Sequence, residues 1–179
     1  MDRVDRIKLV LVMALFAAPA LAAWIARDVW QPATITSYGE LLEPREPSIA
    51  GLVDAAGVPS SLAELSGHWV LLTVVGGDCE EACRRQIYLS RQVRIAQGPE
   101  QGRVVRALLR PMANANAEEP DLHRYSAPAE ALAAWSGAGS VRTYVMDPRG
   151  RVMLRFPADP DGKGMLRDLR QLLKASKIG

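Results

Sequence analysis

The segment His68–Gln86, HWVLLTVVGGDCEEACRRQ, decides the fold because it joins an apolar run to the only two cysteines of the chain. The run ends at Val75 and is bounded by glycines, as is typical of a strand that is buried on both faces. A helix is expected after the cysteines, because apolar residues recur there at helical spacing and a Gly-Pro pair at 98–99 would end it. Cys79 and Cys83 therefore lie where a strand gives way to a helix.

The rest of the chain alternates between strand-like and helix-like segments. A turn at Ala56-Gly57 precedes a short helical turn that Ser60 or Ser61 can cap. The later elements are expected, in order, to be a strand at 103–109, a polar loop from 111 to about 126, a helix ending at 135, a hairpin of strands 141–146 and 151–156, and a helix around 165–173. This β-α-β-α-β-β-α order is the thioredoxin-like order and predicts a layered α/β sheet.

Composition excludes some functions. The 179 residues are 49% hydrophobic and 23% charged, which fits one globular domain with an additional segment. Lys and Arg total 22 against 20 acidic residues, so the net charge is only +2. No basic surface is expected, and we predict that the protein does not bind nucleic acid.

The additional segment lies at the N-terminus. Residues 9–26, LVLVMALFAAPALAAWIA, carry no charge and are long enough to cross a bilayer as one helix. Arg3, Arg6 and Lys8 precede this run and favour a cytoplasmic location for residues 1–8. We therefore expect a single-pass anchor in a bacterial cytoplasmic membrane, with the C-terminal domain in the periplasm. A cleaved signal peptide remains open, because Ala20-Leu21-Ala22 is a small-x-small pattern, and so does a buried core helix.

Residues 27–48 are expected to form a linker. This segment contains three prolines and no sustained periodicity, which is typical of extended chain. The folded, thioredoxin-like domain is accordingly predicted to span residues 49–179.

The chain resembles the Sco/SenC copper chaperones of cytochrome c oxidase assembly. The resemblance lies in the segments DAAGVPSSLAELSGHWVLLTVVGGDCEEAC and RTYVMDPRGRVMLRF, and Cys79 and Cys83 match the CxxxC pair of that family. Two features depart from the pattern: Arg84 replaces the proline after the second cysteine, and Gly139 lies at the position of the histidine ligand. The resemblance implies copper as a ligand, and a cytochrome oxidase subunit or its assembly factors as partner.

The position and spacing of Cys79 and Cys83 make them candidates for redox chemistry. A helix N-terminus favours a thiolate at Cys79, whereas the neighbouring acids Asp78, Glu80 and Glu81 oppose it, so the sign of the pKa shift stays open. Cysteines four residues apart on a helix have Cα atoms about 6 Å apart, within the range of a disulfide. So small a loop stabilises little, which favours a reversible bond in an exported protein. A local structural disulfide and two inert thiols are the alternatives.

A metal site is conceivable around the same pair. Thiolates favour copper(I), and Cys79 and Cys83 could bind it with a third ligand. The loop assigned to residues 111–126 would emerge on the edge of the sheet where the cysteines lie, so His123 or Met112 could supply that ligand. A solvated loop histidine is the simpler interpretation of His123. His68, at the far end of the buried strand, is expected to be a surface residue.

Two functions follow from the sequence. The first is a membrane-tethered periplasmic factor that handles thiols or copper for cytochrome c oxidase assembly, with Cys79 and Cys83 as the reacting residues. The alternative is a degenerate thioredoxin-like assembly or binding module, with a structural disulfide and no redox or metal activity.

Overall fold

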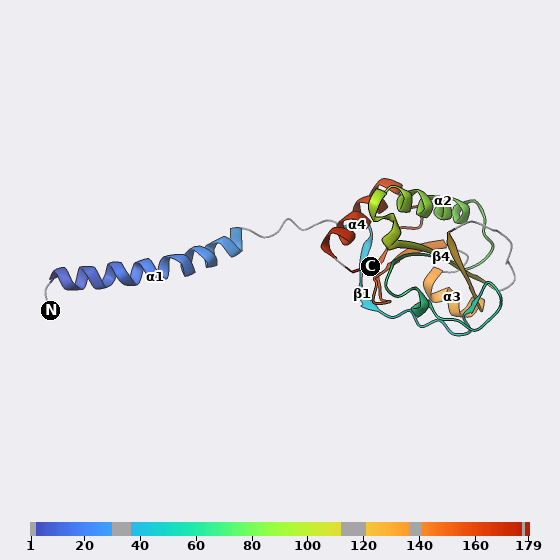
Figure 1. Ribbon diagram of the computed structural model, residues 1–179, viewed down its shortest axis with the longest axis horizontal. Helices are drawn as coiled ribbons and strands as arrows, with labels where there is room; N and C mark the ends of the chain where they lie inside the picture. Colours follow the sequence, from blue (N-terminus) through green and yellow to red (C-terminus); the bar gives the residue numbers. More distant parts are fainter. Residues whose placement is uncertain (1–2, 30–36, 112–120, 137–140, 177) are drawn as a thin grey trace. The chain divides into compact units, whose positions relative to one another are not determined.

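The computed structural model describes residues 3–29, 37–111, 121–136, 141–176 and 178–179 (Figure 1). Within the N-terminal helix, only some of the side chains belong to the described part. The chain divides into two compact units at the boundary between Thr36 and Ser37, and each is described by itself.

The first unit contains the helix α1, Arg3–Val29. It includes the whole charge-free run 9–26 and extends the expected helix at both ends. Its described apolar side chains are exposed, among them Leu15 at 73%, Phe16 at 76% and Trp24 at 69%. Among the residues that the structure describes, we find no helix with the length and apolar character needed to cross a membrane.

The second unit is built on a seven-stranded sheet with the order β1-β7-β6-β3-β4-β5-β2. The strands are β1 Glu40–Arg45, β2 Val53–Asp54, β3 Trp69–Val75, β4 Val104–Pro111, β5 Leu122–Ala127, β6 Val141–Met146 and β7 Val152–Arg155. Strands β3, β4 and β5 are parallel, whereas β6 is antiparallel to β3 and β7 to β6. All seven residues of β3 are buried, as its apolar run predicts.

Helices cover both faces of the sheet (Figure 1). The helices α2, Glu81–Ile95, and α4, Gly162–Ala175, lie on one face. The helix α3, Ala129–Ser136, and the 3₁₀ turn η1, Leu62–Leu65, lie on the other. A second 3₁₀ turn, η2, Gly98–Arg103, follows α2. The predicted thioredoxin-like α/β fold, its hairpin and its helices after the cysteines and at the C-terminus are therefore confirmed.

The predicted start of the domain at residue 49 is wrong. Residues 37–48, which were assigned to the linker 27–48, belong to the folded unit, and β1 pairs with β7 at the edge of the sheet. The buried carboxylate of Asp168 accepts hydrogen bonds from the Ser37 hydroxyl and from the backbone N–H groups of Tyr38 and Gly39. Most side chains of β1 are exposed, so this edge strand lacks the apolar alternation that identifies strands in sequence. At its start the linker assignment is also wrong, because residues 27–29 continue α1.

The predicted loop from 111 to 126 is also partly wrong. Residues 112–120 lie outside the described residues, but 122–127 form β5, which is parallel to β4. Its sequence, LHRYSA, is short and largely polar because the strand lies near the edge of the sheet and only Tyr125 and Ala127 are buried. The two-residue strand β2, which pairs with β5, was likewise missed.

Candidate functional site

Cys79 and Cys83 form a disulfide, with their Cα atoms 5.1 Å apart. The predicted pairing is confirmed. The pair does not lie on one helical turn as expected, because α2 begins at Glu81 and Glu80 is its N-cap residue in an extended conformation. Cys79 therefore belongs to the loop that leaves β3, whereas Cys83 lies in the first turn of the helix.

The two sulfur-bearing residues differ in exposure. Cys83 is 2% exposed and packs against Val75, Leu108 and Val141. Cys79 is only partly buried at the border of the same cluster. A thiol arriving from solvent can therefore reach the Cys79 sulfur more readily, and the sulfur released by such an attack would be the protected one.

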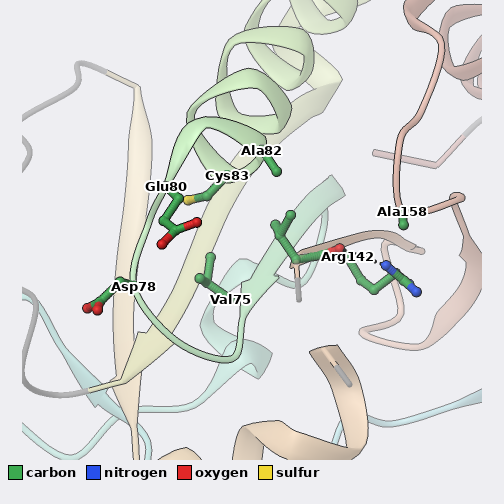
Figure 2. Close-up of a pocket in the computed structure, with 8 residues that line it drawn as sticks. Val75, Asp78, Glu80, Ala82, Cys83, Arg142 and Ala158 are labelled. Carbon is green, nitrogen blue, oxygen red and sulfur yellow. Dashed lines mark hydrogen bonds between the residues drawn. The ribbon is translucent and has the colours of Figure 1, made fainter. Parts of the chain in front are cut away.

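A cavity of about 250 Å³ borders Cys83 (Figure 2). Its lining combines apolar side chains with three charged ones: Val75, Asp78, Glu80, Ala82, Cys83, Val141, Arg142 and Ala158. Figure 2 shows the carboxylates of Asp78 and Glu80 on one side and the guanidinium of Arg142 on the other. The cavity thus offers an apolar floor beside the disulfide and charges of both signs at its rim.

The buried side chain of Gln86 fixes α2 at this cavity. Its amide nitrogen donates to the Ala158 carbonyl oxygen at 2.6 Å, and its amide oxygen accepts from the Thr143 hydroxyl at 2.8 Å. The Thr143 hydroxyl also lies 3.3 Å from that of Thr73 in β3. Gln86 therefore joins the helix that carries Cys83 to two strands and to the segment after β7.

The sequence interpretation missed Gln86, although a signal was present. Gln86 follows Cys83 by three residues and precedes Ser90 and Val93 at helical spacing, and all four are buried. A polar residue on the apolar face of a helix is expected to have a specific partner. The charged residues Asp78 and Glu80, in contrast, are exposed, as their sequence predicts.

Arg110 is the second residue that was missed. It lies on β4, is 7% exposed, and belongs to a strand that is otherwise mostly apolar. Burial lowers the pKa of its guanidinium, and the nearby charge of Arg124 lowers it further. An arginine at the end of an apolar run, one residue before β4 ends, is the signal that could have identified it.

His123 is not brought to the cysteines. It lies on β5, where Leu122 packs with Cys83 while Tyr125 and Ala127 pack in the core on the opposite face of the sheet. Since side chains alternate along a strand, His123 shares the face of Tyr125. There it borders a cavity together with Asp54 and Glu64. His123 is exposed, as the simpler interpretation expected, but it lies on a strand and not in a loop, and its face of the sheet does not favour it as a third ligand of the thiols.

Other expected ligand positions fall outside the described residues, namely Met112 and Gly139. Within the described ranges, no three or more His, Cys, Asp or Glu side chains are grouped so that they could hold a metal ion. His68 directly precedes β3 and is exposed, as predicted. The donors that the described structure brings together are thus two sulfur atoms.

Solved structures with this fold include Sco proteins with copper bound and a DsbF homologue. The structure of yeast Sco1 with copper bound aligns with a TM-score of 0.55 and 11% identity, over 78% of this chain and 94% of that one. That of Arabidopsis thaliana ScoI with copper bound has a TM-score of 0.54 and 12% identity, over 78% and 99%. A DsbF homologue from Corynebacterium diphtheriae has a TM-score of 0.54 and 14% identity, over 80% and 96%. At such identities the likeness concerns the fold alone, and it confirms the thioredoxin-like architecture, which this chain shares with the Sco structures.

Sequence comparison gives the family. Among curated proteins, none matches this chain in sequence. A family model described as "Transmembrane-like, thioredoxin-like, C-terminal domain" matches residues 69–176, from the start of β3 to the end of α4. This match spans more than half of the chain and includes the disulfide. The chain therefore belongs to the transmembrane-like, thioredoxin-like C-terminal domain family.

Proposed function

We propose that this protein is a membrane-tethered factor that exchanges its Cys79–Cys83 disulfide with the thiols of a protein substrate. The observation that carries the proposal is the unequal burial of the two sulfur-bearing residues beside a cavity at the start of α2. In the exchange, a substrate thiolate attacks the Cys79 sulfur, a new disulfide joins substrate and Cys79, and Cys83 leaves as a thiolate that takes up a proton. A second thiol of the substrate then attacks the substrate sulfur of this mixed disulfide, which releases Cys79 as a thiolate and leaves the substrate as a disulfide and the protein as a dithiol. The reverse of these two exchange steps oxidises the reduced protein.

Single-cysteine variants of the full-length chain in detergent test this proposal. The Cys83→Ser variant retains the accessible sulfur and should form a stable mixed disulfide with oxidised glutathione, measured as a mass increase. The Cys79→Ser variant retains only the buried sulfur and should react at least roughly tenfold more slowly, as expected for a structural buried cysteine. Equal rates for the two variants, or no adduct with either, would refute the assigned roles.

Copper(I) handling is a second candidate function of the same pair. Two thiolates whose Cα atoms are 5.1 Å apart form a soft donor pair that suits copper(I), and solved structures with this fold contain copper. The described residues supply no third strong ligand, so copper would be a cargo that is bound and passed on. The reduced chain should bind one copper(I) in competition with a chromophoric chelator, and either serine variant should abolish this binding. Unchanged binding in both variants would exclude the pair as ligands.

Attachment to a membrane is proposed from α1. The run 9–26 lacks charge. Successive residues of a helix point about 100° apart, so the exposed side chains of Leu11, Val12 and Met13 lie on different sides of α1 and its apolar surface is not confined to one face. Such a helix is expected to be surrounded by an apolar medium. We propose that it anchors the protein in a bacterial cytoplasmic membrane, with the thioredoxin-like domain in the periplasm. Resistance of the protein to alkaline carbonate extraction, and its loss on deletion of residues 9–26, would support this proposal, whereas release of the intact protein would contradict it.

The partner is proposed from the resemblance to Sco-type proteins. We propose a cytochrome oxidase subunit or one of its assembly factors, whose thiols or copper centre the Cys79–Cys83 pair would serve. The alternative, a binding module with a structural disulfide, predicts that a Cys79→Ser, Cys83→Ser double variant supports oxidase assembly as well as the natural chain does. Loss of assembled oxidase in that variant, at unchanged protein level, would favour the proposed chemistry.

A further inference from the structure

Arg110 is a buried charged residue whose guanidinium is incompletely hydrogen-bonded. Its side chain is more than nine-tenths buried, and its Nε has no hydrogen-bond partner among the described residues. None of the ion pairs formed in the described part of the chain includes it. A buried charge without an opposite charge generally lowers the free energy of unfolding by several kcal/mol. A residue of this kind is therefore a candidate for binding an anionic ligand.

The register of the sheet places Arg110 on the face that carries the cluster of Cys83, one side-chain position closer to the end of β3. Leu108 of β4 packs in the cluster that contains Val75, Cys83 and Cys79. Arg110 follows Leu108 by two residues, so its side chain leaves the same face of the sheet about 7 Å closer to the edge at which β3 ends. The loop that carries Cys79 starts at that edge.

A second arginine, Arg124, lies close to Arg110 on the same face of the sheet. Leu108 is the partner of Arg124 across the β4–β5 ladder and Arg110 that of Ser126, so the two arginines are diagonal neighbours on one face. The influence of Arg124 on the pKa of Arg110 agrees with this proximity. The nearby acids Asp78 and Glu80 are exposed, so water and salt screen their charges more than that of Arg110.

We propose that Arg110 is an anion-binding residue of the disulfide site, which receives the carboxylate of an acidic residue next to the cysteine of a polypeptide substrate. This inference rests on the proposed exchange function. A guanidinium binds a carboxylate through charge-assisted hydrogen bonds, which are strongest when both groups leave water. A carboxylate tethered beside the attacking thiol would arrive together with it, so Arg110 would select substrates by the residue that flanks their cysteine.

Two matched peptides test the selection in the full-length oxidised chain in detergent. Ac-Gly-Cys-Asp-Gly-NH₂ and Ac-Gly-Cys-Asn-Gly-NH₂ differ only in one charge, and the rate of mixed-disulfide formation is measured for each by mass spectrometry. Arg110→Met should lower the ratio of the acidic to the amide rate by roughly tenfold or more, the discrimination that one charge-assisted hydrogen bond supplies. Arg110→Lys, which retains the charge, should restore much of this ratio.

Arg84→Met is the control, because it removes the same charge from an exposed position next to Cys83. It should leave the ratio of the two rates nearly unchanged. An equal slowing of both peptides in Arg110→Met, or an unchanged ratio, would overturn the inference and leave Arg110 a structural residue.

A binding measurement separates this inference from the exchange function. If neither peptide exchanges with the natural disulfide, the exchange function fails, and the carboxylate site is then judged by NMR with N-acetylaspartate amide, which has no thiol. A saturable shift of the Arg110 Nε–H signal and of the neighbouring backbone amides supports the site, provided that the same amides do not shift in Arg110→Met. The lack of any saturable shift in the natural chain overturns it.

Discussion

Replacing Gln86 by alanine tests how α2 is held at the disulfide. The side chain is 1% exposed and makes two hydrogen bonds of 2.6 and 2.8 Å, to Ala158 and from Thr143, with a third contact to Val141 at 3.5 Å that is too long to contribute much. Each of the two short bonds contributes about 1 kcal/mol, and the cavity and orphaned partners left by Gln86→Ala add about 1 kcal/mol more. We therefore expect the free energy of unfolding to fall by about 3 kcal/mol.

Urea unfolding of the oxidised full-length chain, followed by near-ultraviolet circular dichroism, measures this loss. Gln92→Ala is the matched control, because Gln92 lies on the same helix with an exposed side chain. The control should change the free energy of unfolding by less than about 0.5 kcal/mol. A Gln86→Ala variant that loses less than about 1 kcal/mol, or no more than the control, would refute the idea that this network fixes the helix.

Three further substitutions test other parts of the account. Asp168→Ala removes the acceptor of three hydrogen bonds from residues 37–39 and should lower the free energy of unfolding by about 3 kcal/mol, with faster amide exchange in β1; unchanged exchange there would contradict this. Burial raises the pKa of the Tyr144 hydroxyl, and the nearby Arg155 partly opposes this shift. The contribution of the neutral Tyr144 to stability is therefore complete below about pH 10, the pKa of an unfolded tyrosine, and is lost as the pH rises through the pKa of Tyr144 in the folded state. The melting temperature should therefore fall less steeply above about pH 10 in Tyr144→Phe than in the natural chain, and parallel curves would contradict the assignment. His123→Ala should leave copper(I) affinity within about twofold, since His123 faces away from the thiols, and a tenfold loss would make it a ligand.

The sequence allowed the central part of the fold to be predicted because its elements carry strong periodic signals. The apolar run of β3, the helical spacing of α2 and α4, and the Asp-Pro-Arg-Gly turn between β6 and β7 all depend on burial or on local backbone chemistry. In that turn, Gly150 adopts a φ of +82°, which glycine accommodates readily. Local signals of this kind need no knowledge of distant neighbours.

The strands β1 and β5 could not be predicted for the opposite reason. β1 is held by backbone pairing to β7, which is far away in sequence, and β5 by pairing to the preceding strand β4 and to the distant strand β2. The side chains of β1 and β5 are largely exposed or polar. His123 was misplaced because β5 was expected to be a loop. A side chain in a loop can point in any direction, whereas a strand fixes which face of the sheet the side chain lies on. The cysteine pairing was predictable from a spacing of four residues, but the roles of Gln86 and Arg110 depend on contacts between α2, β4 and β6 that only the folded chain brings together.

The reduction potential of the Cys79–Cys83 pair tests the central claim most directly. It can be measured by equilibrating the full-length chain in detergent with glutathione or dithiothreitol buffers and counting alkylated thiols by mass spectrometry. A pair that exchanges with substrates should have a potential above about −270 mV, in the range of known disulfide-exchanging proteins. A potential below about −300 mV, typical of structural disulfides, would show that the bond stays closed under physiological conditions and would contradict the proposed function.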